Sequence, residues 1–110
     1  MFENDMMLHG ELKKWFEKKQ LFTEEVQEYL SDRTFGTVFN SVCLAFRNDC
    51  PFNDKETRVY YQKILSHPLT EWSLKKADTN RYSNWLTYLI KHRQLTLLNL
   101  VAKIKRKKNG

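Results

Sequence analysis

Residues 35–46 read FGTVFNSVCLAF and carry the strongest helical period in the chain. The apolar members of this stretch recur at spacings of three and four, at Phe35, Val38, Phe39, Val42 and Phe46. An α-helix has about 3.6 residues per turn, so this spacing places them on one face of a helix. Residues 37–42 alone would also suit a β-strand, but the wider period favours a helix. Gly36 costs such a helix about 1 kcal/mol relative to alanine, and we therefore expect a close helix crossing there.

Two shorter helices are predicted before this stretch. The first rests on an apolar stripe that consists of Leu8, Leu12, Trp15 and Phe16. Thr23 is a good N-cap for the second, which covers residues 24–30 and has acidic residues in its first turn. The polar sequence Ser-Asp-Arg at residues 31–33 predicts a break before the central helix.

Capping signals place the helix boundaries after the central stretch. Pro51 predicts an end to the central helix, because the residue before a proline is pushed out of the α region. Asn53 can cap the next helix, with Glu56 three residues later to reach back to it. His67 and Pro68 end that helix.

Three further helices are predicted from there to the C-terminal end. Thr70 is expected to cap a short helix over residues 71–76. The last two follow from apolar stripes, formed by Tyr82, Trp85, Leu86, Leu89 and Ile90 and by Leu97, Leu98, Val101 and Ile104. The chain of 110 residues has the size of one domain, and Gly 3 and Pro 2 are low counts that disfavour a turn-rich β fold. We therefore predict an all-α fold, a compact bundle of six or seven short-to-medium helices without a sheet.

The positive charge is concentrated at one end of the chain. The net charge is +6, and five basic residues fall within the last eight positions: Lys103, Lys105, Arg106, Lys107 and Lys108. We assign residues 1–102 to a single helical domain and residues 103–110 to a basic C-terminal tail. The five basic residues are the candidate contacts for a membrane surface or another anion, and a solvated helix end is the alternative. Nucleic acid is a less favoured partner, because a duplex-binding domain more often spreads its basic residues over a folded face.

The sequence has no recognisable pattern for catalysis. The three histidines are far apart, and the spacing of Cys43 and Cys50 is not that of a zinc site. Neither a glycine-rich phosphate loop nor a nucleophile elbow is present. We therefore predict no catalytic residue, no metal and no cofactor in this chain. Trp15, Trp72 and Trp85 stand beside leucines at helical spacing, and we assign them to the core rather than to a site that stacks on sugars or bases.

The sequence also predicts a compartment. Its start is acidic and lacks the long apolar run of a signal peptide, and no segment approaches the length of a spanning helix. Two reduced thiols fit a cytosolic protein. We therefore expect a cytoplasmic chain that is either free or peripheral at the inner face of the membrane.

The order of elements in the second half resembles the C-terminal helical region of bacterial family-two glycosyltransferases, which build capsule and exopolysaccharide repeat units. A charged helix over residues 55–64 is followed by LSHPL at 65–69 and a short helix through Trp72. An aromatic and leucine-rich helix over 82–90 then leads to KHRQLTLLNL at 91–100 and a basic end. The upstream helices also resemble those that follow the catalytic domain in that family.

This resemblance implies a role without catalysis. The family's nucleotide-binding sheet, Asp-x-Asp motif and catalytic base are not in this sequence, so no catalytic residue carries over. The chain would be the helical C-terminal domain, or a stand-alone relative, of a transferase of cell-surface polysaccharide synthesis. It would dock on the catalytic domain, associate with itself, or lie on an anionic membrane. The alternative is a small basic helical protein that binds nucleic acid or acts as a regulatory or interaction protein.

Overall fold

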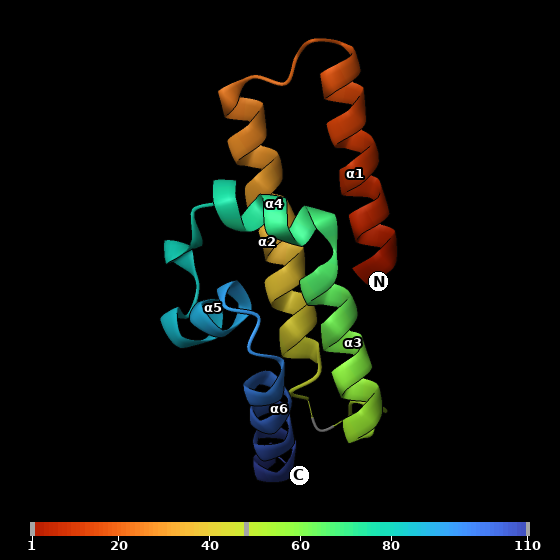
Figure 1. Ribbon diagram of the computed structural model, residues 1–110, viewed down its shortest axis with the longest axis vertical. Coiled ribbons are helices and arrows are strands. Elements are labelled where there is room, and N and C mark those ends of the chain that lie inside the picture. The colour runs from red at the N-terminus through yellow and green to blue at the C-terminus, as the bar shows by residue number, and fades with distance from the viewer. Residues whose placement is uncertain (1, 48, 110) are drawn as a thin grey trace.

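The fold is built from helices alone within the part of the chain that the computed structural model describes, residues 2–47 and 49–109 (Figure 1). The side chains of Arg81 and of residues 107–109 lie outside the described part. The elements are α1 (Phe2–Lys18), α2 (Glu24–Leu44), α3 (Asp54–Ser66), α4 (Pro68–Lys76), the 3-10 turn η1 (Thr79–Arg81), α5 (Asn84–Lys91) and α6 (Leu95–Asn109). The predicted all-α bundle is confirmed.

The central helix α2 is longer than predicted and has no break at residues 31–33. Ser31 is buried, and its hydroxyl donates to the carbonyl of Glu28 at 3.0 Å. Thr34 likewise donates to the carbonyl of Leu30 at 2.8 Å. Both hydroxyls donate their hydrogen bonds to backbone carbonyls of the same helix, so these polar side chains do not interrupt it. Thr23 is the N-cap, as predicted, and accepts from the backbone N–H of Val26.

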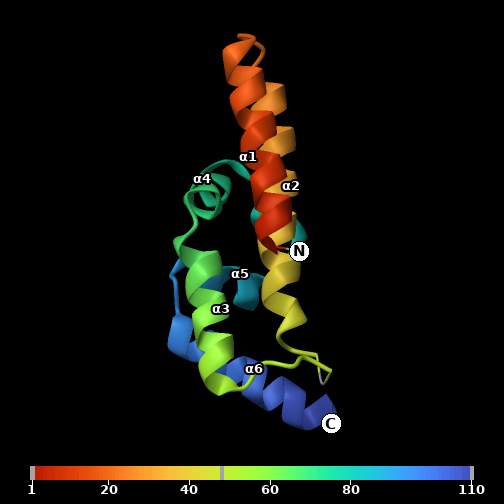
Figure 2. The same cartoon turned by 90° about the vertical axis from the view of Figure 1, so that its right-hand side faces the viewer.

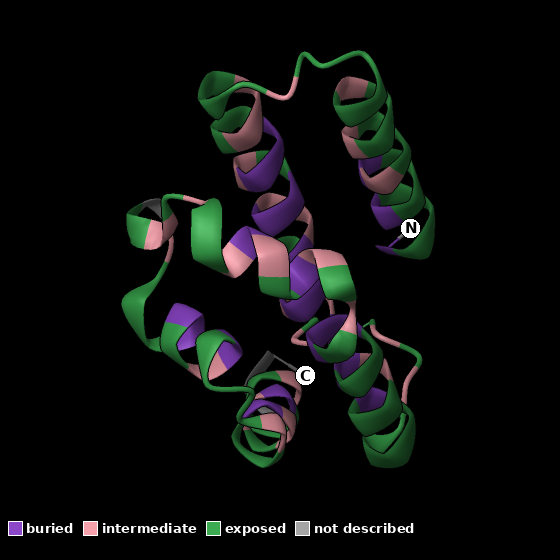
Figure 3. Ribbon diagram, turned by 45° about the horizontal axis from the view of Figure 1, so that its top comes forward, coloured by how far each residue is buried: buried purple, intermediate pink, exposed green. Residues whose placement is uncertain are grey.

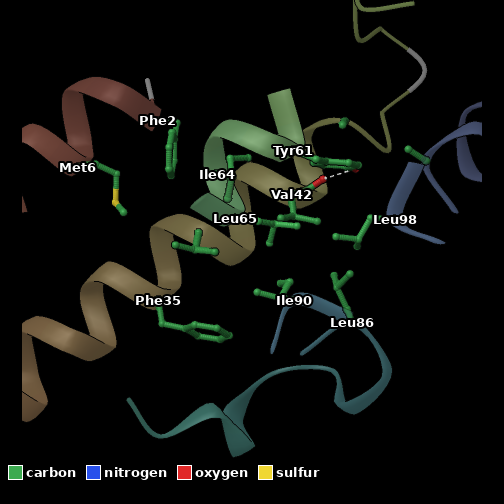
Figure 4. Close-up of a cluster of buried hydrophobic side chains, with 13 residues drawn as sticks. Phe2, Met6, Phe35, Val42, Tyr61, Ile64, Leu65, Leu86, Ile90 and Leu98 are labelled. Carbon is green, nitrogen blue, oxygen red and sulfur yellow. Dashed lines mark hydrogen bonds between the residues drawn. The ribbon is translucent and has the colours of Figure 1, made fainter. Parts of the chain in front are cut away.

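One continuous core joins α2 to α1, α3, α5 and α6 (Figure 4). Its largest buried side chains include Met6, Phe35, Tyr61, Ile64, Leu86, Ile90 and Leu98. The hydroxyl of Tyr61 donates to the carbonyl of Val42 at 3.0 Å, so this polar group is satisfied within the core. The predicted stripe of residues 35–46 is therefore the main apolar face of the fold.

Local capping signals were correct for α3 and wrong for α4. Asn53 and Glu56 form a capping box, in which each side chain accepts from the other residue's backbone N–H at 2.8 and 3.2 Å. α4 is capped by His67, whose Nδ1 accepts from the backbone N–H of Leu69 at 3.1 Å, and not by Thr70. Pro68 fits the first helical position because its missing N–H needs no partner there. Thr70 is buried in the first turn and donates to the carbonyl of Ile64.

A side chain, rather than the predicted crossing helix, approaches Gly36. A Cβ atom at Gly36 would lie 3.1 Å from the hydroxyl oxygen of Tyr82. The ring of Tyr82 packs on Phe35 and Phe39, with centroid distances of 5.0 and 4.7 Å. The expected close approach therefore exists, but it comes from the connection before α5.

The tryptophans lie mostly outside the core. Trp15 and Trp85 are about half exposed, so their assignment to the core is wrong, and Trp72 is half-buried against Phe22. The inner side of α1 carries Phe2, Met6 and His9 instead of the predicted leucine stripe. None of the described helices is both long enough and apolar enough to cross a bilayer.

Candidate functional site

The three predicted anion contacts whose side chains the structure describes, Lys103, Lys105 and Arg106, do not form one surface. α6 continues past residue 102 without interruption, so the predicted boundary between domain and tail lies within a helix. Lys103 and Lys105 are exposed, whereas Arg106 is half-buried. The side chains of Lys107 and Lys108 lie outside the described part of the chain.

Arg106 points inward and binds the body of the protein. Its guanidinium donates to the carbonyls of Ala45 and Phe52 at 2.5 and 3.0 Å and to the hydroxyl of Thr57 at 2.6 Å. All three guanidinium nitrogens therefore have protein partners. Arg106 ties α6 to the end of α2, to the connection that follows and to α3, and the structure separates it from the exposed lysines.

The two exposed lysines each contact a neighbouring element. The ammonium of Lys103 lies 3.5 Å from the carboxylate of Asp54, and both side chains are largely exposed. The ammonium of Lys105 lies 5.9 Å from the ring centre of Trp85 on α5. An ion pair this exposed contributes little to stability. Both ammonium groups consequently remain at the surface of the protein.

α6 is apolar on two opposite sides. Leu98 and Ala102 are fully buried against the core. The opposite side, which we call the α6 outer face, consists of Leu97, Leu100, Val101 and Ile104. Leu100 is 50% and Ile104 56% exposed. Each residue turns the helix by about 100°, so Lys103 and Lys105 lie on either side of Ile104 and border this face.

Exposed aromatic side chains on α5 extend this region. Trp85 contacts Lys105 and is about half exposed, and Tyr88 on the same helix is also exposed. The indole combines a large apolar ring with one N–H donor, a combination that suits a boundary between apolar and wet surroundings. The region therefore joins aliphatic, aromatic and cationic groups on two neighbouring helices.

A separate groove of about 780 Å³ lies between the start of α1, the end of α2 and α3. Apolar side chains such as Phe2, Leu44 and Val59 line it. Charges of both signs surround it, at Glu3, Arg47, Asp49, Lys55, Glu56 and Lys63. Glu3 pairs with Lys63 and Arg47 with Asp49, at 3.6 and 2.8 Å. This mixed rim gives the groove no preference for one sign of ligand charge.

Titratable groups inside the fold are engaged in packing. His9 is buried, and its Nε2 lies 3.0 Å from the hydroxyl of Thr37. Burial lowers the pKa of His9 and raises the pKa of the Cys43 thiol. Cys43 and Cys50 are free thiols. Within residues 2–47 and 49–109, no three His, Cys, Asp or Glu side chains come together as metal ligands.

Comparisons with protein-family models, curated proteins and solved structures found no match to this chain. The evidence that the α6 outer face is a functional site therefore comes from the structure alone. Sequence reasoning missed it because the predicted stripe combined one residue of the inner side, Leu98, with three of the outer side. The available signal was the density of apolar residues on α6, which exceeds what one buried face requires.

Proposed function

We propose that the chain is a non-catalytic docking domain that attaches to an anionic membrane surface through the α6 outer face. One observation carries this proposal: a stripe of exposed aliphatic side chains, bordered by lysines, lies on a helix whose opposite side is anchored in the core. A helix with this pattern can lie in the plane of the interface with its apolar side below the lipid headgroups.

The exposed lysines and Trp85 favour the same orientation, with the α6 outer face toward the membrane. A lysine close to an anionic leaflet contributes about 1 kcal/mol. The aliphatic stems of Lys103 and Lys105 can lie beside the apolar face while their ammonium groups reach lipid phosphates. Trp85 would then sit at the level of the headgroups, where tryptophan is enriched in membrane proteins.

A nucleic-acid role has less support from the same residues. A phosphate backbone is bound by clustered basic side chains, and much of the affinity comes from the release of counterions. Here the exposed lysines flank leucine and isoleucine, and Arg106 already has three protein partners. An apolar stripe at this position suits lipid better than phosphate and sugar.

Vesicle co-sedimentation tests the membrane proposal. We expect the wild-type chain to bind vesicles of phosphatidylcholine mixed with phosphatidylglycerol and to bind pure phosphatidylcholine much more weakly. Leu100→Glu combined with Ile104→Glu should abolish this binding. Leu21→Glu, a change at a similarly exposed leucine in the connection between α1 and α2, is the control and should bind like the wild type. Equal binding by the double variant and the control would rule out the α6 outer face.

Point substitutions are preferable to removal of residues 103–110. That truncation would delete Arg106 together with the lysines, and with it the three hydrogen bonds that hold α6 against the body. Lys103→Gln with Lys105→Gln removes the charge alone. We expect this variant to bind anionic vesicles several-fold more weakly and to keep its helical circular-dichroism spectrum.

We further propose that the catalytic partner is a family-two glycosyltransferase of cell-surface polysaccharide synthesis, acting on the cytoplasmic side of the membrane. The support is the order of the elements: α3 is followed by Pro68 and α4, and then by α5 and α6. This is the order on which the resemblance to that family rests. Co-purification of the chain with a glycosyltransferase catalytic domain encoded in the same or an adjacent reading frame tests this proposal. If no such domain is encoded nearby, or if it does not bind the chain, the proposal fails.

A further inference from the structure

α1 carries a second apolar stripe that no other helix covers. The stripe consists of Leu8, Leu12 and Trp15, which are 54%, 37% and 50% exposed. These positions are spaced by four and three residues and share one side of the helix. α1 stands at the edge of the molecule, and its buried residues lie toward α2 (Figures 1 and 3). We call this side of α1 the α1 stripe.

Four exposed charged side chains lie beside the α1 stripe, and the acidic ones precede the basic ones along the chain; Lys14, also exposed, projects farther from the stripe. Asp5 and Glu11 lie in the first two thirds of α1, Lys18 is its last residue, and Lys19 follows directly after it. All four are exposed, and none takes part in an ion pair with another residue of the described chain. Glu11 and Lys18 are seven residues apart, about two helical turns, so they lie on the same flank of the stripe.

This order of charges makes the stripe complementary to itself. A two-fold axis across the stripe would place two copies of α1 antiparallel, and each flank would then face the same flank of the other copy. Glu11 of each copy would lie near Lys18 of the other, and Leu12 near Trp15. A parallel arrangement would instead place acidic groups opposite acidic groups. We infer that a second copy of this chain docks on the α1 stripe, with the two α1 helices antiparallel.

The α6 outer face does not fit a second copy in the same way. The described charges at its border, Lys103 and Lys105, are both positive, so two such faces would repel each other. The two surfaces therefore select different partners, and the inference about α1 does not rest on the proposed membrane role. The α1 stripe is small compared with the roughly 800 Å² per partner of a standard interface. We expect the dimer to be weak, with dissociation in the micromolar range or above.

Sedimentation velocity of the full chain over a wide range of concentrations tests this inference. We expect a concentration-dependent shift from monomer to dimer. Leu12→Lys should raise the dissociation constant by at least about tenfold, because it places a charge at the centre of the interface. Val59→Lys, at a similarly exposed aliphatic side chain on α3, is the matched control and should leave the dimer unchanged. Circular dichroism of both variants checks that the fold is kept.

A charge exchange tests the antiparallel arrangement. Glu11→Lys should weaken the dimer several-fold, and the double change Glu11→Lys with Lys18→Glu should restore it, because the unlike pairs form again with their signs exchanged. Added salt should weaken the wild-type dimer. A wild-type chain that stays monomeric at millimolar concentration, or a dimer that withstands Leu12→Lys, overturns the inference. A double change that fails to restore the dimer rejects the antiparallel arrangement.

Discussion

The guanidinium of Arg106 donates hydrogen bonds to two backbone carbonyls and one hydroxyl from three different segments of the chain. A hydrogen bond that involves a charged group contributes about 1.5–3 kcal/mol, and its loss leaves the partner atom unsatisfied. Since these partners are partly buried, water can replace the guanidinium only incompletely. At the scale of the residue, Arg106 is therefore a polar anchor that joins α6 to the body of the protein.

We predict that Arg106→Met lowers the free energy of unfolding by about 2–4 kcal/mol, because it keeps the aliphatic stem and removes all the donors. Urea denaturation followed by circular dichroism measures the change. Lys105→Met is the control and should change stability by less than about 1 kcal/mol, since its ammonium is at the surface. If the two variants have the same stability, the hydrogen bonds of Arg106 do not anchor α6.

The role of Arg106 could not be read from the sequence. Its three partners lie 61, 54 and 49 positions away along the chain. The local sequence shows only an arginine among lysines, and this composition predicts a solvated or anion-binding tail. The distinction between Arg106 and its neighbours follows from which side of α6 each residue occupies, and that is set by tertiary packing.

At the scale of the element, signals from neighbouring residues were right for the cap of α3 but wrong for the cap of α4 and for the break predicted within α2. The capping box of α3 joins Asn53 and Glu56, three residues apart, and it was predicted correctly. The break predicted at residues 31–33 was wrong because the hydroxyls there bond to the helix's own carbonyls. The backbone N–H of Asp78 also donates to the carboxylate of Asp32, at 2.9 Å, and this contact between distant segments leaves no local pattern.

The capping box of α3 should contribute measurably to the stability of the protein. Asn53→Ala should lower the free energy of unfolding by about 1 kcal/mol, because the Asn53 side chain satisfies an otherwise unpaired backbone N–H in the first turn of α3. Ser83 occupies the N-cap position of α5 without a side-chain hydrogen bond, so Ser83→Ala is the matched control and should have little effect. Thermal unfolding of the two variants measures the difference. Equal losses would show that the box does not stabilise α3.

Periodicity identified most helices but not the side that each one buries. The stripes on α1 and α6 were both recognised, yet most of their leucines face away from the core. An amphipathic pattern indicates that a helix will cover some apolar surface, and the choice of surface depends on the other helices. α1 and α6 have apolar residues on two sides, so their sequences are compatible with one partner in the fold and another outside it.

At the scale of the molecule, the two exposed stripes belong to different regions of an elongated fold. The principal extents are 48 × 25 × 19 Å, with α6 at one end of the long axis and α1 along the other half (Figure 2). Two copies joined through α1 would leave both α6 outer faces uncovered. Attachment of both faces to one membrane would raise the overall affinity without any new contact, because the second attachment becomes intramolecular.

Two histidines make the packing of α1 against the rest of the protein dependent on pH. His9 on α1 is buried against Thr37 of α2, and His67 contacts the ring of Phe2 at a centroid distance of 5.8 Å. Burial lowers the pKa of both from the ordinary value of 6.5, and Arg33 lowers that of His9 further while Asp5 opposes it. The Nδ1 atom of His67 accepts the capping hydrogen bond of α4, which it can do only while that nitrogen carries no proton.

We therefore predict that acidification loosens α1 before the rest of the fold. A histidine with a lowered folded pKa binds protons more tightly in the unfolded state, so its contribution to stability is complete above about pH 6.5 and declines as the pH falls below that value. Hydrogen exchange at pH 7 and pH 5, corrected for the intrinsic rate, should show the largest loss of protection in α1. His9→Gln should reduce this pH dependence, whereas His92→Gln, at the exposed histidine that forms the C-cap of α5, should retain it. A uniform loss of protection over all six helices, or a pH dependence that His9→Gln leaves unchanged, would contradict the assignment to α1.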